Sequence, residues 1–266
     1  MALVTIKHRL DLMISLTDSA SGRPVGGRVA LRKNGSPLSF YRKEAGRAML
    51  MNEGREDFDL EVDAEGYEPE KLRVDYAGLA GDLPMMELYL MPQDRYGNEY
   101  ATFEGCLPGI VAAEAAKAGS SAWTAGSYDE RKRLLAIQSV YRSEPDGSRY
   151  ALIAPDQATF EPVEFAGKSE DGVYRLASPL LSESVEGRAL SRRVQGKVSG
   201  DNYLLRLPRD GTAVCWILRI ATGAGESFQT VAIGESETGT GLSPRTLEVS
   251  PQTTGITRNN IGMKGG

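Results

Sequence analysis

The chain has 266 residues, a net charge of −5 and a single histidine. One histidine excludes a histidine-rich metal site, and it leaves His8 as the only imidazole base for a nucleophilic serine or cysteine. The 30 glycines and 13 prolines exceed the ordinary content of roughly 12%, so they predict many turns and therefore β structure. The acidic balance argues against nucleic acid or an anionic membrane as the main partner.

The sequence contains no targeting or membrane signal. No apolar run reaches the roughly 20 residues that a membrane-spanning helix requires. Charged side chains interrupt the apolar stretch of the first 16 residues, at Lys7, Arg9 and Asp11, whereas a signal peptide needs an uninterrupted run of about 7–15 residues. We therefore expect a protein that is cytoplasmic as synthesised, without membrane insertion, and that could become part of a released particle.

The two cysteines belong to no CxxC pair. In a reducing compartment both are expected to be thiols, with Cys106 in a loop and Cys215 as a small core residue. A disulfide between them is the alternative, and it would require export by another route.

Residues 1–92 are predicted to form short consecutive strands. Apolar and polar side chains alternate over Leu10–Leu16 and again over Phe58–Ala64, which places one face of each strand against a core. Asn34-Gly35 is a strong signal for a hairpin turn. Seven such strands, with turns about every 8–12 residues, predict an antiparallel β-sandwich.

Two stretches within residues 8–92 carry a family resemblance. The first runs from Thr17-Asp18 through Gly22-Arg23-Pro24-Val25-Gly26-Gly27 to Val29-Ala30-Leu31 and Asn34-Gly35. The second, Phe58–Glu68, is similar to an L-x-V-x-A-x-G-Y strand and turn. Both resemble the transthyretin-like fold of carboxypeptidase regulatory-like modules. The resemblance implies an Ig-like β-sandwich without catalytic residues of its own, serving as a scaffold, a spacer or a binding surface.

Residues 93–131 are predicted to be a helical connector. Pro108 is suited to start a short alanine-rich helix through Ile110–Lys117, with Gly119 ending it. Ser127–Glu130 has a capping-box pattern, which would begin a second helix. Whether residues 127–141 form a helix or a strand stays open.

Residues 132–233 are predicted to be a second β-rich domain, a sandwich or a barrel, with no recognisable family. Strand signals return between turns, at Tyr150–Ile153, Phe160–Phe165, Val173–Leu176 and Val194–Val198. Val214–Leu218 is apolar on both faces, which favours a central strand. Phe228–Ile233 is its expected neighbour.

The last segment, residues 234–266, is polar and low in complexity. Such a composition is typical of a segment that orders only when something holds it. We therefore expect an extended arm that contacts another subunit; folding back over its own domain is the alternative. The arm's apolar side chains are its predicted contacts, at Leu242, Leu247, Val249, Ile256, Ile261 and Met263.

Catalytic devices are mostly missing from the sequence. Gly167-Lys168-Ser169 imitates the end of a phosphate-binding loop, but Pro162 occupies the position of the required first glycine. No Gly-x-Ser-x-Gly elbow supplies a nucleophile for His8, and no Asp-x-[Asp/Asn]-x-[Asp/Asn]-Gly calcium loop is present. The sequence therefore predicts no catalytic, cofactor-binding or metal-binding residues.

The leading functional hypothesis is a non-enzymatic structural subunit of a larger assembly, for which a phage-tail-like or injection particle is one setting by analogy. The alternative is a glycan- or surface-binding module that stacks sugars on exposed aromatic rings of the connector, at Tyr96, Tyr100, Phe103 and Trp123. The third hypothesis is a carboxylate-based hydrolase, which needs only two suitably separated acids. Its candidates are Glu161, Glu164, Glu183 and Glu186.

Overall fold

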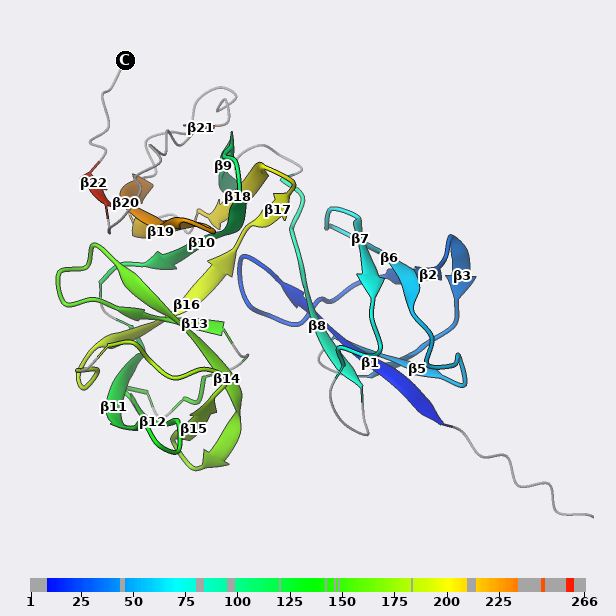
Figure 1. Ribbon diagram of the computed structural model, residues 1–266, viewed down its shortest axis with the longest axis horizontal. Helices are drawn as coiled ribbons and strands as arrows, with labels where there is room; N and C mark the ends of the chain where they lie inside the picture. The colour runs from blue at the N-terminus through cyan, green and yellow to red at the C-terminus, as the bar shows by residue number, and fades with distance from the viewer. Residues whose placement is uncertain are drawn as a thin grey trace, which may run out of the picture. The chain divides into compact units, whose positions relative to one another are not determined.

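The computed structural model describes residues 9–43, 46–79, 84–94, 99–119, 121–141, 143–145, 147, 149–182, 184–209 and 214–233, together with two short backbone segments, 245–246 and 257–260. Across these residues the regular structure consists of strands, which confirms the all-β prediction (Figure 1). The chain divides into two compact units. Unit 1 comprises residues 1–19 and 23–93, and unit 2 comprises residues 20–22 and 94–266.

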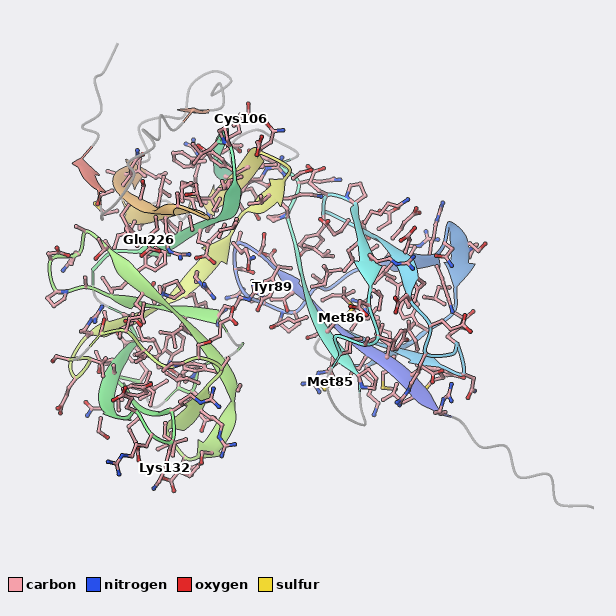
Figure 2. The ribbon with its side chains drawn as sticks, viewed as in Figure 1. Met85, Met86, Tyr89, Cys106, Lys132 and Glu226 are labelled. Carbon is pink, nitrogen blue, oxygen red and sulfur yellow. The ribbon has the colours of Figure 1, made fainter. Side chains whose placement is uncertain are left out.

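Unit 1 is a two-sheet structure. Its strands are β1 (Leu10–Asp18), β2 (Val29–Lys33), β3 (Ser36–Leu38), β4 (Tyr41–Lys43), β5 (Arg47–Met51), β6 (Phe58–Ala64), β7 (Glu70–Val74) and β8 (Met85–Leu90). They form two four-stranded sheets, in the orders β4-β5-β1-β8 and β3-β2-β6-β7. The edge strand β8 carries Met85, Met86 and Tyr89 (Figure 2). It runs parallel to β1, so the expectation of a wholly antiparallel sandwich is wrong for this pair. Parallel neighbours need a long connection, and here the other six strands of the unit provide it.

The core of unit 1 lies where the sequence alternation places it. Leu12, Ile14 and Leu16 on β1 are buried, as are Leu60 and Val62 on β6, and both sheets contribute to one cluster. The Asn34-Gly35 turn joins β2 to β3 with positive φ at both residues (51° and 80°), the geometry of a type I′ hairpin turn. Local sequence signals therefore predicted most of this unit.

The strands of unit 2 are β9 (Tyr100–Cys106), β10 (Ile110–Lys117), β11 (Trp123–Asp129), β12 (Leu134–Ser139), β13 (Arg149–Ile153), β14 (Phe160–Glu170), β15 (Val173–Leu176), β16 (Ala189–Gln195), β17 (Lys197–Ser199), β18 (Asn202–Pro208), β19 (Val214–Thr222), β20 (Gly225–Ile233), β21 (Arg245–Thr246) and β22 (Thr257–Asn260). Six of them close on themselves in the order β11-β12-β15-β14-β13-β16, because β16 also pairs with β11. All six contribute side chains to one buried cluster, so this part of the unit is a small barrel with a packed interior.

The other half of unit 2 is a sandwich. The large sheet continues from β16 through β10 and β19 to β20, and a second sheet, β17-β18-β9, packs with it around a separate core. Gly196 lies where the chain passes from β16 in one sheet to β17 in the other. Its N–H donates to Ala113 O at 2.7 Å, and a Cβ at this position would lie 2.7 Å from Leu204 O. Only glycine leaves room for this corner.

The predicted helical connector is wrong. Ile110–Lys117 forms β10, which pairs with both β16 and β19. Its residues 113–116 are all buried, so both faces are covered and the strand shows no simple alternation. The capping-box pattern at Ser127–Glu130 falls on the end of β11 and the turn into β12, which makes residues 127–141 a hairpin. Unit 2 therefore includes the predicted connector.

The described pieces of the C-terminal segment are two short strands. β21 pairs in parallel with β9, and β22 pairs in parallel with β20. Within this single chain, both therefore extend sheets of unit 2. The predicted arm contacts Leu242, Leu247, Val249, Ile256, Ile261 and Met263 lie outside the described residues.

Candidate functional site

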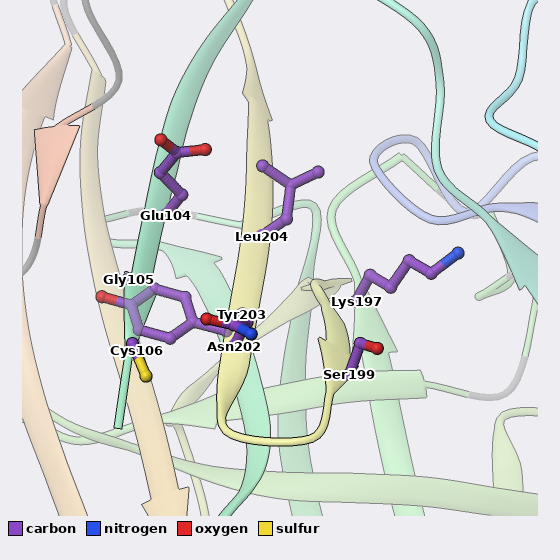
Figure 3. A pocket seen from close by; sticks show the side chains of 8 residues that line it. All are labelled: Glu104, Gly105, Cys106, Lys197, Ser199, Asn202, Tyr203 and Leu204. Carbon is purple, nitrogen blue, oxygen red and sulfur yellow. The ribbon is translucent and has the colours of Figure 1, made fainter. Parts of the chain in front are cut away.

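A hollow of about 580 Å³ lies on the β17-β18-β9 sheet (Figure 3). Its lining consists of Glu104, Gly105, Cys106, Lys197, Ser199, Asn202, Tyr203 and Leu204. This volume falls within the range of about 300–1,000 Å³ that is typical of small-molecule sites. We therefore take the hollow as the candidate binding site.

Strand register arranges six of the lining side chains in two rows across β17, β18 and β9. The first row is Lys197, Leu204 and Glu104. The second row is Ser199, Asn202 and Cys106. Successive residues of a strand point to opposite faces, so all six lie on the face opposite the buried core residues of these strands. With strands about 4.8 Å apart and a rise of about 6.7 Å per two residues, the rows cover an area of about 10 by 7 Å.

Hydrogen bonds fix one end of the hollow. The Asp201 carboxylate accepts from the Gly109 N–H at 3.0 Å, and the Asp201 carbonyl accepts from the Leu107 N–H at 2.7 Å. These bonds tie the turn that follows Cys106 to the start of β18, directly beside Asn202. The side chains of Cys106 and Asn202 in the second row therefore stand on a constrained backbone.

Cross-strand packing supports the hollow from the core side of the sheet, where Tyr203 is buried. Tyr203 is opposite Gly105 in the β18–β9 ladder, and its ring reaches across the glycine (Figure 3). A Cβ on Gly105 would lie 2.6 Å from Tyr203 Oη, so a larger residue would displace the ring. A tyrosine covering a glycine in this way stabilises a sheet position that would otherwise lack packing.

A second polar cluster is a row of alternating charges across the large sheet, in the order Glu164, Arg193, Glu114, Arg219 and Glu226. Arg149 is a further partner of Glu164. The Glu114 carboxylate accepts from Arg193 at 2.8 Å and from Arg219 at 2.7 Å. Because both of its oxygens are engaged, Glu114 has a structural role. The sequence pattern around Arg193 indicates a charged surface, but this arginine is buried.

The sheet curls around this charged row. The rings of Phe160 on β14 and Phe228 on β20 meet edge to face, with centroids 5.6 Å apart, although four strands separate β14 from β20 in the sheet. Both rings belong to a buried cluster with Ala116 and Ile217. Glu114 and Arg193 lie neither in the barrel interior nor in the sandwich core. This third apolar cluster explains why they are nevertheless buried.

Two of the predicted catalytic acids have structural partners. Glu161 holds the loop after β15, where its carboxylate accepts from the backbone N–H groups of Leu181 and Ser182 and from Ser182 Oγ. Glu164 forms ion pairs with Arg149 and Arg193. Glu186 is exposed, and Glu183 lies outside the described residues. The described acids among these candidates therefore cap a loop, form ion pairs or lie on the exposed surface.

The three predicted glycan-stacking rings that the structure describes do not form an exposed platform. Phe103 is buried in the sandwich core, and Tyr100 packs against the same core. Trp123 lies on the barrel, where its ring meets Tyr150 edge to face and its indole N–H donates to Ser143 O at 2.9 Å. Tyr96 lies outside the described residues. The prediction is wrong for Phe103, because β9 turns this side chain inward.

Three further sequence features have structural outcomes. Lys168 of the phosphate-loop imitation is hydrogen-bonded to Glu144 and Asp171, and these carboxylates raise its pKa. Cys215 is exposed, so its predicted core position is wrong: it alternates with the inward-facing Trp216. Cys106 is also an exposed thiol, at the end of β9 rather than in a loop. His8 lies outside the described residues.

The described residues show neither a metal-binding group nor a membrane-spanning helix. Among the residues that the structure describes, no group of three or more His, Cys, Asp or Glu side chains is placed to hold a metal ion. No helix in that part of the chain has the length and apolar character needed to cross a membrane.

Comparison with solved structures finds distant likenesses. A candidate carbohydrate-binding protein from Bacteroides uniformis matches 85% of this chain and 100% of its own, at 11% identity and a TM-score of 0.22. A chimeric titin Z1Z2 tandem carrying a GRGDS peptide from fibronectin matches 84% of this chain and 95% of its own, at 10% identity and a TM-score of 0.15. No family model and no curated protein matches the chain. TM-scores this low carry no argument about function.

Proposed function

We propose that the protein is a non-enzymatic structural subunit that assembles with copies of itself or with other subunits, through residues 234–266 as an exchanged arm. The observation that carries this proposal is strand addition at two sheet edges. Without the C-terminal strands, β9 and β20 would be edge strands of their sheets, and β21 and β22 pair with them. A phage-tail-like particle is one setting for such a subunit, by analogy alone.

An open strand edge exposes unpaired N–H and C=O groups, which are a template for pairing with a further strand. The residues between β20 and β21, and between β21 and β22, form connections of about ten residues, which can span roughly 35 Å when extended. That reach allows the same two segments to bind the same two edges of a neighbouring copy. Exchange of an identical element preserves its contacts, so it is a low-cost route to an oligomer.

The engaged acids support the non-enzymatic part of the proposal. Glu161 caps a loop and Glu164 forms two ion pairs, so two of the four carboxylate candidates for hydrolysis already have structural partners. We also propose that unit 1 is a transthyretin-like module that acts as a spacer. Its two four-stranded sheets, and the Asn34-Gly35 turn between β2 and β3, support this proposal.

Disulfide trapping distinguishes an exchanged arm from a folded-back tail. Ser227 on β20 and Thr257 on β22 are register partners, and neighbouring strands hold such residues within reach of a disulfide. We expect the S227C/T257C variant, with Cys106 and Cys215 replaced by serine, to form covalent multimers on a non-reducing gel. A variant that closes its disulfide only within one chain would contradict the proposal.

Two matched measurements control this experiment. Each single-cysteine variant should stay monomeric on the same gel, which excludes random surface oxidation. Deletion of residues 235–266 should leave a folded but monomeric protein by light scattering, whereas an unchanged oligomer would also contradict the arm.

A further inference from the structure

We propose that the hollow on the β17-β18-β9 sheet binds a neutral, polyhydroxylated ligand, namely one or two sugar rings. This proposal is independent of the exchanged arm. It rests on the side chains of Glu104, Asn202, Ser199 and Leu204, which register places on one face of three adjacent strands (Figure 3). None of these four residues contributes to the buried core clusters.

The polar side chains fit hydroxyl groups rather than an ion. The Glu104 carboxylate only accepts hydrogen bonds, whereas the Asn202 amide and the Ser199 hydroxyl both donate and accept. A ligand that satisfies all three must itself carry groups that donate and accept, as sugar hydroxyls do. The planar carboxylate and amide can each bind two neighbouring hydroxyls at once, so they also favour the spacing found on a sugar ring.

The centre of the hollow suits the apolar face of a sugar. Leu204 lies between the polar side chains and is partly buried, which leaves part of its surface for the C–H groups of a ring. The two rows span about 10 by 7 Å, so the array is wider than one ring along its long side. The Asp201 bonds and the Tyr203–Gly105 packing hold this surface in place before any ligand arrives.

The charges of the hollow do not favour a strongly anionic ligand, because Lys197 and Glu104 lie in the same row and leave the lining without net charge. A strongly anionic ligand, such as a phosphorylated or sulfated compound, would meet the exposed Glu104 carboxylate at close range. A ligand held by a metal ion is not favoured either, since no metal-binding group was found among the described side chains. Binding of an uncharged sugar should accordingly depend little on salt, because it requires no charge pairing.

Titration calorimetry of the full chain with a panel of neutral, phosphorylated and sulfated mono- and disaccharides tests the proposal. We expect at least one neutral sugar to bind, and Asn202→Ala and Glu104→Ala to weaken that binding by about tenfold each, because each removes hydrogen bonds to the ligand. Glu104→Gln keeps the shape and an acceptor oxygen, so it should weaken binding less than Glu104→Ala. Lys132→Ala, on the turn between β11 and β12, is the matched surface control and should bind like the parent (Figure 2).

Three outcomes would overturn the proposal. The first is that no neutral sugar binds, and the second is that binding survives both Asn202→Ala and Glu104→Ala. The third is that only phosphorylated or sulfated sugars bind, which would indicate an anion site rather than a site for neutral sugars. Circular dichroism of each variant, together with its oligomeric state by light scattering, separates loss of the hollow from loss of the fold or of the assembly.

Discussion

Glu114 on β10 and Arg193 on β16 form an ion pair of 2.8 Å in which the two side chains are only 6% and 5% exposed. The second oxygen of Glu114 accepts from Arg219 on β19 at 2.7 Å. Taking a buried ion cluster of this kind out of water costs free energy. The ion pairs offset this cost only while each charge keeps a counter-charge. Three neighbouring strands therefore depend on a single carboxylate.

Glu114→Gln should lower the free energy of unfolding by about 1.5–3 kcal/mol, because it removes a buried carboxylate and leaves Arg193 and Arg219 with only the more exposed Glu164 and Glu226 as counter-charges. Urea unfolding followed by circular dichroism measures this change. Glu226→Gln is the matched control, since Glu226 pairs with the same Arg219 but is more exposed, and it should cost about 1 kcal/mol or less. Equal losses of unfolding free energy in both variants would show that burial does not determine how much each ion pair contributes to stability.

Gly196→Ala should destabilise unit 2 by about 1–3 kcal/mol, because the new methyl group would overlap backbone atoms that side-chain motion cannot relieve. Its Cβ would lie 2.7 Å from Leu204 O and 2.9 Å from Ala113 O. Gly223→Ala is the control, since no atom lies within 4 Å of a Cβ at that position. Thermal unfolding of both variants measures the difference, and a Gly196→Ala variant as stable as the parent would contradict this account of the corner.

The sequence predicts strands well where apolar and polar side chains alternate or where large apolar residues cover both faces, and poorly where small residues do so, as in β10. Alternation over Leu10–Leu16 and Phe58–Ala64 correctly located β1 and β6. The sequence of β10 predicts a helix because its alanines favour helices and its burial on both faces removes the period of two. Only pairing with β16 and β19 decides its structure, and that pairing is not a local property of the sequence.

The candidate site was missed for the same reason. Its rows join Glu104 and Cys106 to residues 197–204, which are distant in the chain and become neighbours only through the β9–β18 ladder. Glu114 is equally non-local, with its arginines 79 and 105 positions away. The alternation of inward Ala101 and Phe103 with outward Glu104 was the available signal, and it was obscured by the assignment of this region to a connector.

Asp11 should make unit 1 sensitive to acid. Burial alone would raise the pKa of its carboxyl, but a hydrogen bond from Arg9 and the backbone N–H groups of Gly54 and Glu53 outweigh burial and lower it. A carboxyl with a lowered folded-state pKa stabilises the fold above its unfolded pKa of about 3.9, and this contribution is lost as the pH falls through the folded-state pKa.

Asp11→Asn should therefore be less stable than the parent at pH 7, and the two should converge as the pH falls below about 4. Thermal unfolding across this range, followed by a signal from unit 1, measures the gap. Asp63→Asn is the control, since Asp63 is exposed on β6 and should leave the pH dependence unchanged. A constant gap between Asp11→Asn and the parent from pH 7 to pH 3 would refute the role of this carboxylate.

Glu161→Ala should loosen the loop at 177–182 without unfolding the barrel. The carboxylate is the acceptor for the Leu181 and Ser182 N–H groups, while the Tyr128 hydroxyl accepts from Leu180 N at 3.0 Å and keeps its contact in the variant. Leu180 is buried in the barrel and the adjacent Leu181 is 90% exposed, so the loop holds one leucine inside and presents the other to solvent.

Amide hydrogen exchange at residues 181 and 182 should accelerate in Glu161→Ala, with exchange in the barrel strands unchanged. Glu186→Ala, an exposed acid nearby in sequence, should leave exchange at both residues as in the parent, and equal acceleration in the two variants would rule out the capping role of Glu161.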